Sequence, residues 1–212
     1  MAPRIRGKGS EPSGIHIEPE IAGGSKFMNI TLPTSARLMS SSEYQIVSRV
    51  FGDTLPWRQR IIVTNGAGLQ NRPFTIPTSL IRVLLGAAAT GFLAPITAAA
   101  GSLTTFINLA YLMNVGNAYT SLDTSQKGLL VHETTHVWQG KNSTLALTYV
   151  FSSCVSQCIR GGAAYSYTPG GNWSSYNVEQ QASIVEDWFN AGEPTSGPLW
   201  GYIDNYVRKG IT

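Results

Sequence analysis

The chain has 212 residues, enough for one domain with a substantial hydrophobic core. Its 15 Lys and Arg residues and 12 Asp and Glu residues give a formal charge of only +3, which is too small to indicate nucleic acid as a partner. Charged residues make up 13% of the chain and small polar residues are abundant, a composition typical of secreted or periplasmic proteins.

Residues 1–25 predict a flexible leader rich in Gly, Pro and Ser. The basic residues Arg4, Arg6 and Lys8 are followed by no apolar run, so the sequence predicts no secretory signal peptide. Three explanations remain open: a cytoplasmic protein, export by a route without a cleavable signal, or a domain excised from a longer protein. The abrupt start favours the excised domain, with residues 26–212 as a single folded unit.

The first half of this domain predicts one helix and a small sheet. Ser40–Glu43 forms a helix cap, and the helix runs to about Phe51. The β-branched run Arg60–Thr64 predicts a strand, and Pro73–Pro77 predicts an extended segment that its prolines place at a sheet edge. Leu103–Leu109 predicts another strand. Its part Thr104–Leu109 is a candidate for holding substrate as an added strand, the alternative being an ordinary core strand.

Residues 83–100 contain no charge. Their length approaches that of a membrane span, but they are rich in Gly, Ala and Thr, and Pro95 would kink a helix. We favour a mobile surface insertion of small residues, ahead of a loop that touches a membrane or a partner and ahead of a spanning helix.

The second half predicts helices, and with the sheet it gives an α+β fold with a small N-terminal sheet and a helical C-terminal half. Cys154 and Cys158 lie four residues apart in one of these helices. Two buried thiols, a disulfide and a second metal site are the alternatives for this pair. Four helices are predicted. The first begins at a cap at 123–126 and ends at Gly140, and the second spans about 143–160. The third spans about 176–191 and is closed by Gly192, and the fourth runs from Pro198 to Gly210.

The first of these helices contains the pentapeptide His132-Glu133-Thr134-Thr135-His136. Residues four apart lie on one face of a helix, so both imidazoles can bind the same zinc ion (Zn2+). Glu133 then lies beside the open coordination position, where it can act as a general base. The HExxH pattern therefore predicts a catalytic zinc site, the alternative being a surface helix with chance His and Glu residues.

A catalytic zinc site needs a third protein ligand. The only other histidine is His16, in the predicted leader, so a carboxylate is the better candidate. Glu179 and Glu186 are seven residues apart, about 10 Å along a helix, and cannot share one zinc. We favour Glu179, because the small Ala182 one turn later allows close packing on the motif helix. Glu186 or Asp187 is then expected to orient a ligand imidazole through its other ring nitrogen, the alternative being a solvated carboxylate.

These residues indicate a hydrolytic mechanism. Zinc binding lowers the pKa of a water molecule toward neutrality, and Glu133 takes its proton and returns it to the leaving amine. The developing oxyanion requires a second electrophile besides zinc. Tyr165, Tyr167 and Tyr176 lie in or just after the loop before Glu179, and we expect Tyr176 or Tyr167, ahead of Tyr165, to donate a hydroxyl. Because the chain has 9 tyrosines, structural roles for all three are the alternative.

A family resemblance rests on two motifs. The segment Leu130–Gln139 resembles the signature HExTHVxQ of bacterial zincin domains in secretion-system toxins. Glu179-Gln180-Gln181-Ala182 looks like the Glu-x-x-Ala helix that supplies the third ligand in gluzincin-type peptidases, several of which continue with Asp where this chain has Ser183. The length and arrangement are similar to the C-terminal metallopeptidase extension of VgrG-type spike proteins of the type VI secretion system.

The resemblance implies a zincin-like fold and an antibacterial effector domain carried on a secretion spike. It implies export without a signal peptide and action in the periplasm of a rival cell, with a protein or peptide substrate and an immunity protein as partners. Three hypotheses follow: a zinc metallopeptidase, a zinc amidase that acts on the peptide stems of peptidoglycan, and a non-enzymatic module that binds a membrane or partner through residues 83–100 and holds zinc for structure.

Overall fold

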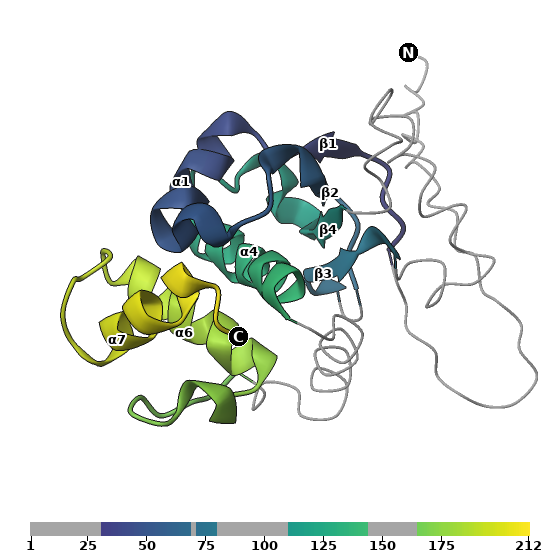
Figure 1. The fold of residues 1–212 in the computed structure, drawn as a ribbon. Helices are drawn as coiled ribbons and strands as arrows, with labels where there is room; N and C mark the ends of the chain where they lie inside the picture. Colours follow the sequence, from purple (N-terminus) through teal and green to yellow (C-terminus); the bar gives the residue numbers. More distant parts are fainter. Residues whose placement is uncertain (1–30, 69–70, 80–109, 144–164) are drawn as a thin grey trace, which may run out of the picture.

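The computed structural model describes residues 31–68, 71–79, 110–143 and 165–212. Within these ranges it is mixed α and β, with a four-stranded sheet and four α-helices (Figure 1). No helix in the described part is long and apolar enough to cross a membrane. Several predicted features lie outside the described residues: the leader, the uncharged segment 83–100, the strand Leu103–Leu109, the helix expected after Ser143, and the cysteine pair.

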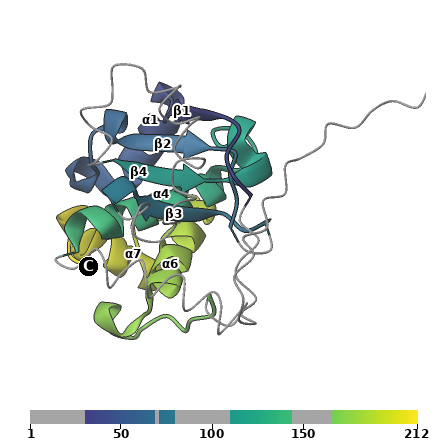
Figure 2. The same ribbon diagram turned by 90° about the vertical axis from the view of Figure 1, so that its right-hand side faces the viewer.

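The sheet has the strand order β1–β2–β4–β3, and Figure 2 looks onto it. Strands β2 and β4 pair in parallel at the centre, while β1 and β3 pair antiparallel with them. Both central strands are buried along their length. The bounds are β1 Ala36–Leu38, β2 Ile61–Thr64, β3 Phe74–Pro77 and β4 Tyr111–Asn114.

Strand β3 takes the edge position among the described strands, as the prolines around it predict. Strand β4 was not predicted, although it forms the centre of the sheet. Its sequence Tyr-Leu-Met-Asn contains no β-branched residue, so the usual local signal for a strand is missing.

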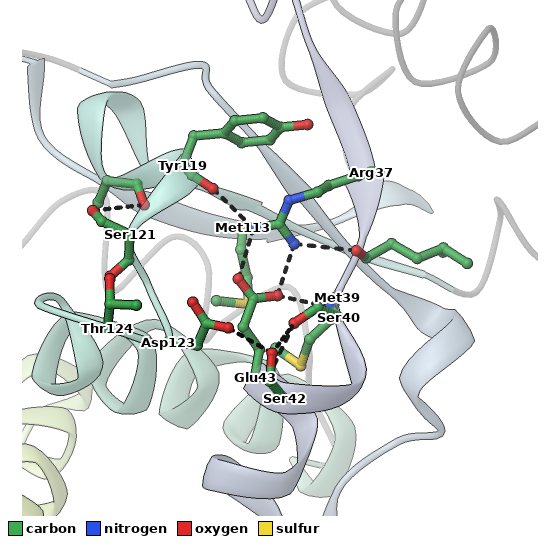
Figure 3. Close-up of polar contacts among 12 residues, drawn as sticks. Arg37, Met39, Ser40, Ser42, Glu43, Met113, Tyr119, Ser121, Asp123 and Thr124 are labelled. Carbon is green, nitrogen blue, oxygen red and sulfur yellow. Dashed lines mark hydrogen bonds and ion pairs between the residues drawn. The ribbon is translucent and has the colours of Figure 1, made fainter.

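Helix α1, Ser41–Phe51, begins where the sequence predicts, with Ser40 as N-cap. The Ser40 side chain accepts a hydrogen bond from the Glu43 amide, and the Glu43 carboxylate accepts one from the Ser40 amide. The same carboxylate accepts hydrogen bonds of 2.7 and 2.6 Å from Arg37 of β1, whose guanidinium also reaches the carbonyl of Tyr119 (Figure 3). This buried acid therefore ties the helix start to the sheet.

Helix α4, Lys127–Asn142, crosses the middle of the molecule between the sheet and the C-terminal helices (Figures 1 and 2). The predicted cap at 123–126 is wrong, because the N-cap is Gln126 and its side chain makes no cap hydrogen bond. Asp123 instead accepts a hydrogen bond from Ser42 at the start of α1. The Asp123 carboxylate, predicted from local sequence to cap α4, thus forms a tertiary contact with α1.

Gly140 does not end α4, contrary to the sequence prediction, but lies inside it. A Cβ atom at Gly140 would lie 2.8 Å from Cε1 of Tyr111 on β4, closer than real contacts allow. The glycine therefore lets the helix approach the aromatic ring. Every residue from Leu130 to Gly140 is buried, which places the motif inside the protein.

Helix α6, Val178–Asn190, packs against the side of α4 that faces away from the sheet, and helix α7, Pro198–Asn205, packs against α6 (Figure 1). Gly192 follows the end of α6 with a φ of 88°, as predicted. Helix α7 begins at Pro198 as predicted but ends at Asn205, and Gly210 instead ends a separate 3-10 turn, Val207–Lys209, in the left-handed conformation. The core between these layers contains three fully buried tryptophans, Trp138, Trp173 and Trp188.

Candidate metal centre

The two histidines of the motif lie one turn apart on α4 and face the same buried space. His132 is 7% exposed and His136 is 3% exposed, and their ring centroids are 5.1 Å apart. The Nε2 atoms of both rings lie 3.4 Å from Oε2 of Glu179. The structure thus brings together the three residues that the sequence singles out as ligands.

Glu179 reaches this point because α6 begins immediately before it. The Asn177 side chain accepts hydrogen bonds from the amides of Glu179 and Gln180 and so fixes the first turn of α6. The fully buried Ala182 lies one turn further along. On α4, a Cβ at Gly128 would lie 2.9 Å from the Asn190 amide group, so the absence of a side chain there permits the two helices to approach.

The three side chains form a group that could hold a metal ion. One ligand atom from each of His132, His136 and Glu179 lies within 4.8 Å of the others, and all three residues are buried. Two imidazole nitrogens and one carboxylate oxygen form a donor set that suits divalent transition metals.

A different side chain contacts the Nδ1 atom of each imidazole, on the opposite side of the ring from Glu179. Nδ1 of His132 lies 2.9 Å from Oε2 of Glu186, and Nδ1 of His136 lies 2.9 Å from Oε1 of Gln139. Glu186 and Asp187 were both candidates for orienting a histidine. Glu186 contacts His132, whereas Asp187 accepts a hydrogen bond from Tyr167. Gln139 lies one turn after His136 on the same helix, but its role was not predicted from the sequence.

Gln139 is itself fixed by two further contacts. Its Nε2 donates to the carbonyl of Val178 at 3.1 Å and to Oε1 of Gln181 at 2.8 Å. Gln181 in turn donates to the carbonyl of Trp173. Because the Gln139 amide nitrogen is committed to acceptors, its oxygen accepts from Nδ1–H of His136. In the neutral form of His136, the lone pair is therefore on Nε2, the atom that lies 3.4 Å from Glu179.

The centre has a strongly negative environment. Burial lowers the pKa of His132, but hydrogen bonds to Glu179 and Glu186 outweigh this effect and raise the pKa to about 10. Burial likewise lowers the pKa of His136, and the charge of Glu179 raises it above its ordinary value. The carboxylates thus favour a positive charge in the space between the rings, either a proton or a metal cation.

Glu133 lies beside this group and is 3% exposed. Its Oε2 accepts a 2.7 Å hydrogen bond from Thr75 on the edge strand β3, a contact that sequence reasoning missed. Burial raises the pKa of Glu133, against the lowering effect of the two histidines and of Thr75. A carboxylate with a raised pKa is better suited to accept a proton near neutral pH.

The three candidate tyrosines lie in different surroundings. The Tyr165 ring centroid is 5.9 Å from that of His132, and Tyr165 lines the same cleft as His132 and Glu133. The Tyr167 hydroxyl donates to Asp187, and the Tyr176 hydroxyl donates to the carbonyl of Thr168. Tyr167 and Tyr176, the two favoured from sequence, line a separate cavity. The structure therefore places Tyr165 closest to the histidines by this measure.

Comparison with known proteins gives one partial relative. A stretch of 76 residues is 40% identical to the type VI secretion system spike protein VgrG2b of Pseudomonas aeruginosa. Part of this chain is thus similar to a VgrG spike protein. The stretch makes up 35% of this chain but only 8% of the spike protein, so the chain matches a small part of that relative's length. No family model and no solved structure matches the chain.

Proposed function

We propose that this chain is a zincin-like metallopeptidase domain that hydrolyses a peptide bond with one bound zinc ion. The observation that carries the proposal is the convergence of His132, His136 and Glu179 in a buried group, with Glu133 beside it. Tetrahedral zinc with ligands at about 2.1 Å requires ligand atoms about 3.4 Å apart. The separation of Glu179 Oε2 from each histidine Nε2 is 3.4 Å, so the residues present fit this ion.

A zinc ion held by these residues would supply Lewis acidity to polarise a scissile carbonyl and to acidify water. Glu133 would take the proton of the attacking water and deliver it to the leaving amine. Thr75 holds one oxygen of that carboxylate and so limits its rotation. Tyr165, which lines the same cleft as His132, would donate its hydroxyl to the developing oxyanion.

The biological setting follows from the partial relative. Similarity to a type VI spike protein supports a role as an effector domain attached to such a spike. Delivery with the spike would carry the domain out of the producing cell without a signal peptide of its own. We propose that it acts in the periplasm of the target cell, and that the producing cell holds an immunity protein against it.

The test is hydrolysis by the zinc-loaded protein of casein and, separately, of purified peptidoglycan. We expect peptide release from casein and a loss of about 100-fold or more in Glu133→Gln, because general-base catalysis contributes at least this much. Zinc content should stay the same in the variant. Soluble muropeptides with no casein cleavage would replace the peptidase by a cell-wall amidase. Undiminished toxicity of zinc-loaded Glu133→Gln in the bacterial periplasm would favour a non-enzymatic module.

A further inference from the structure

The cleft beside the metal-binding residues has a volume of about 380 Å³, within the range of sites that hold small ligands. Among its lining residues in the described part of the chain, Arg72 is the one with a permanent positive charge. Apart from a bound metal, Arg72 is thus the group that would attract an anion there. The lining consists of Arg72, Pro73, Leu129, His132, Glu133, Tyr165 and Glu186.

Backbone hydrogen bonds hold the chain at Gly68, Asn71 and Arg72. The Gly68 amide donates to the carbonyl of Arg72 at 2.8 Å, and the Asn71 amide donates to the carbonyl of Gly68 at 3.0 Å. Asn71 has a φ of 60°, a left-handed conformation that asparagine tolerates better than most residues. Arg72 therefore lies between hydrogen-bonded backbone at Asn71 and the edge strand β3 that carries Thr75.

Within the described ranges, no carboxylate forms an ion pair with Arg72. The ion pairs recorded there join Arg37 to Glu43, Arg49 to Glu193, and the two histidines to their glutamates. Arg72 instead lies near Tyr165, where its positive charge opposes the rise that burial causes in the pKa of that phenol. A guanidinium has five N–H donors and no acceptor, so Arg72 can donate several hydrogen bonds to an anion in the cleft.

We propose that Arg72 binds a carboxylate of the substrate next to the scissile bond, and that the cleft therefore selects acidic peptides. The planar guanidinium matches a carboxylate through two parallel hydrogen bonds. Without Arg72, Glu133 and Glu186 would repel an anionic substrate from the same cleft. This inference rests on the proposed function, because it assumes a metal ion that fixes the position of the scissile bond.

The test measures binding without turnover. Two peptide hydroxamates bind the zinc-loaded protein through the same metal-chelating group and differ only in one neighbouring side chain, Glu or Gln. A second pair carries Gln and ends in a free carboxylate or an amide, which distinguishes a side-chain from a terminal carboxylate. Affinities are measured for the wild type, Arg72→Gln and Arg72→Glu. Arg49→Gln, which removes a cation paired with Glu193 on the surface, is the matched control.

We expect the wild type and Arg49→Gln to prefer the carboxylate member of at least one pair by about tenfold or more, as for a charge-assisted bidentate contact. Arg72→Gln should lose this preference while its affinity for the neutral ligand and its zinc content stay unchanged, and Arg72→Glu should reverse it. Equal binding of both members by the wild type, a preference that survives Arg72→Gln, or a preference lost equally in Arg49→Gln would overturn the inference. Absence of casein hydrolysis beside an Arg72-dependent preference would overturn only the proposed peptidase activity.

Discussion

Two different side chains hold the Nδ1 atoms of the two motif histidines. Glu186 accepts from Nδ1 of His132, and Gln139 accepts from Nδ1 of His136, so each imidazole in its neutral form can offer the lone pair of Nε2 to a metal. Glu186 brings a negative charge to its histidine, whereas Gln139 is neutral and depends on Gln181 for its own orientation. The two ligands are thus held by partners of different charge.

We predict that Gln139→Ala weakens zinc binding by about 10-fold to 100-fold, the usual effect of losing a partner that orients a metal ligand. The measurement is competition for zinc with a chelator of known affinity. Gln126→Ala is the matched control, because Gln126 is exposed and its side chain makes no cap hydrogen bond. Equal zinc affinity in Gln139→Ala and the wild type would contradict the role given to Gln139.

Zinc binding should also release protons. In the metal-free protein the pKa of His132 is about 10, so its imidazole is protonated at pH 7.5, whereas a ligand imidazole must be neutral. Each zinc bound at pH 7.5 should therefore displace at least about one proton, and the affinity should rise with pH up to about 10. Calorimetry in buffers of different ionisation enthalpy measures this number. Binding with no proton release would contradict the environment described for His132.

The residues of the centre differ in how far sequence could find them. The spacing of His132 and His136 follows from helix periodicity, and Glu179 was preferred among the nearby carboxylates because the small Ala182 lies one turn later. Thr75 and Arg72 could not be assigned in this way, because they come from a separate strand and turn whose position depends on tertiary packing. The tyrosines lie outside the regular helices, where the sequence has no periodicity to give direction.

At the level of elements, close packing on both sides of α4 decides where the motif lies. Tyr111 of β4 packs against Gly140, and α6 packs against the other side of the helix near Gly128. Helix α1 was predictable from its capping box, and α6 nearly so from its apolar stripe and closing glycine. The start and end of α4 were not predictable, because both depend on contacts with distant parts of the chain.

We predict that Gly140→Val destabilises the protein by about 1–3 kcal/mol, the usual cost of overpacking in a core. The added side chain would collide with the Tyr111 ring. Gly201→Ala in α7 is the control, because a Cβ there meets no atom within 4 Å. It should be neutral or stabilising by up to about 1 kcal/mol through helix propensity. Urea unfolding measures both, and equal stability of the two variants would contradict the packing described at Gly140.

For the whole molecule, the arrangement joins a sheet on one side of α4 to two helices on the other, with the proposed chemistry at the junction (Figure 1). Strand β3 contributes Thr75, α4 contributes the histidines and Glu133, and α6 contributes Glu179. No single one of these three elements supplies all the residues of the site. The metal would therefore tie the two layers together, so that removing it should affect both activity and the contact of α6 with α4.

The most direct test of this account is the metal content of the purified wild type beside His132→Ala, Glu179→Ala and the control Glu193→Ala. Glu193 pairs with Arg49 on the surface, away from the histidines. We predict about one zinc ion per chain in the wild type and in the control, and loss of that ion in both ligand variants. Retention of zinc in Glu179→Ala would contradict the three-residue centre and would make Glu186 the first alternative ligand.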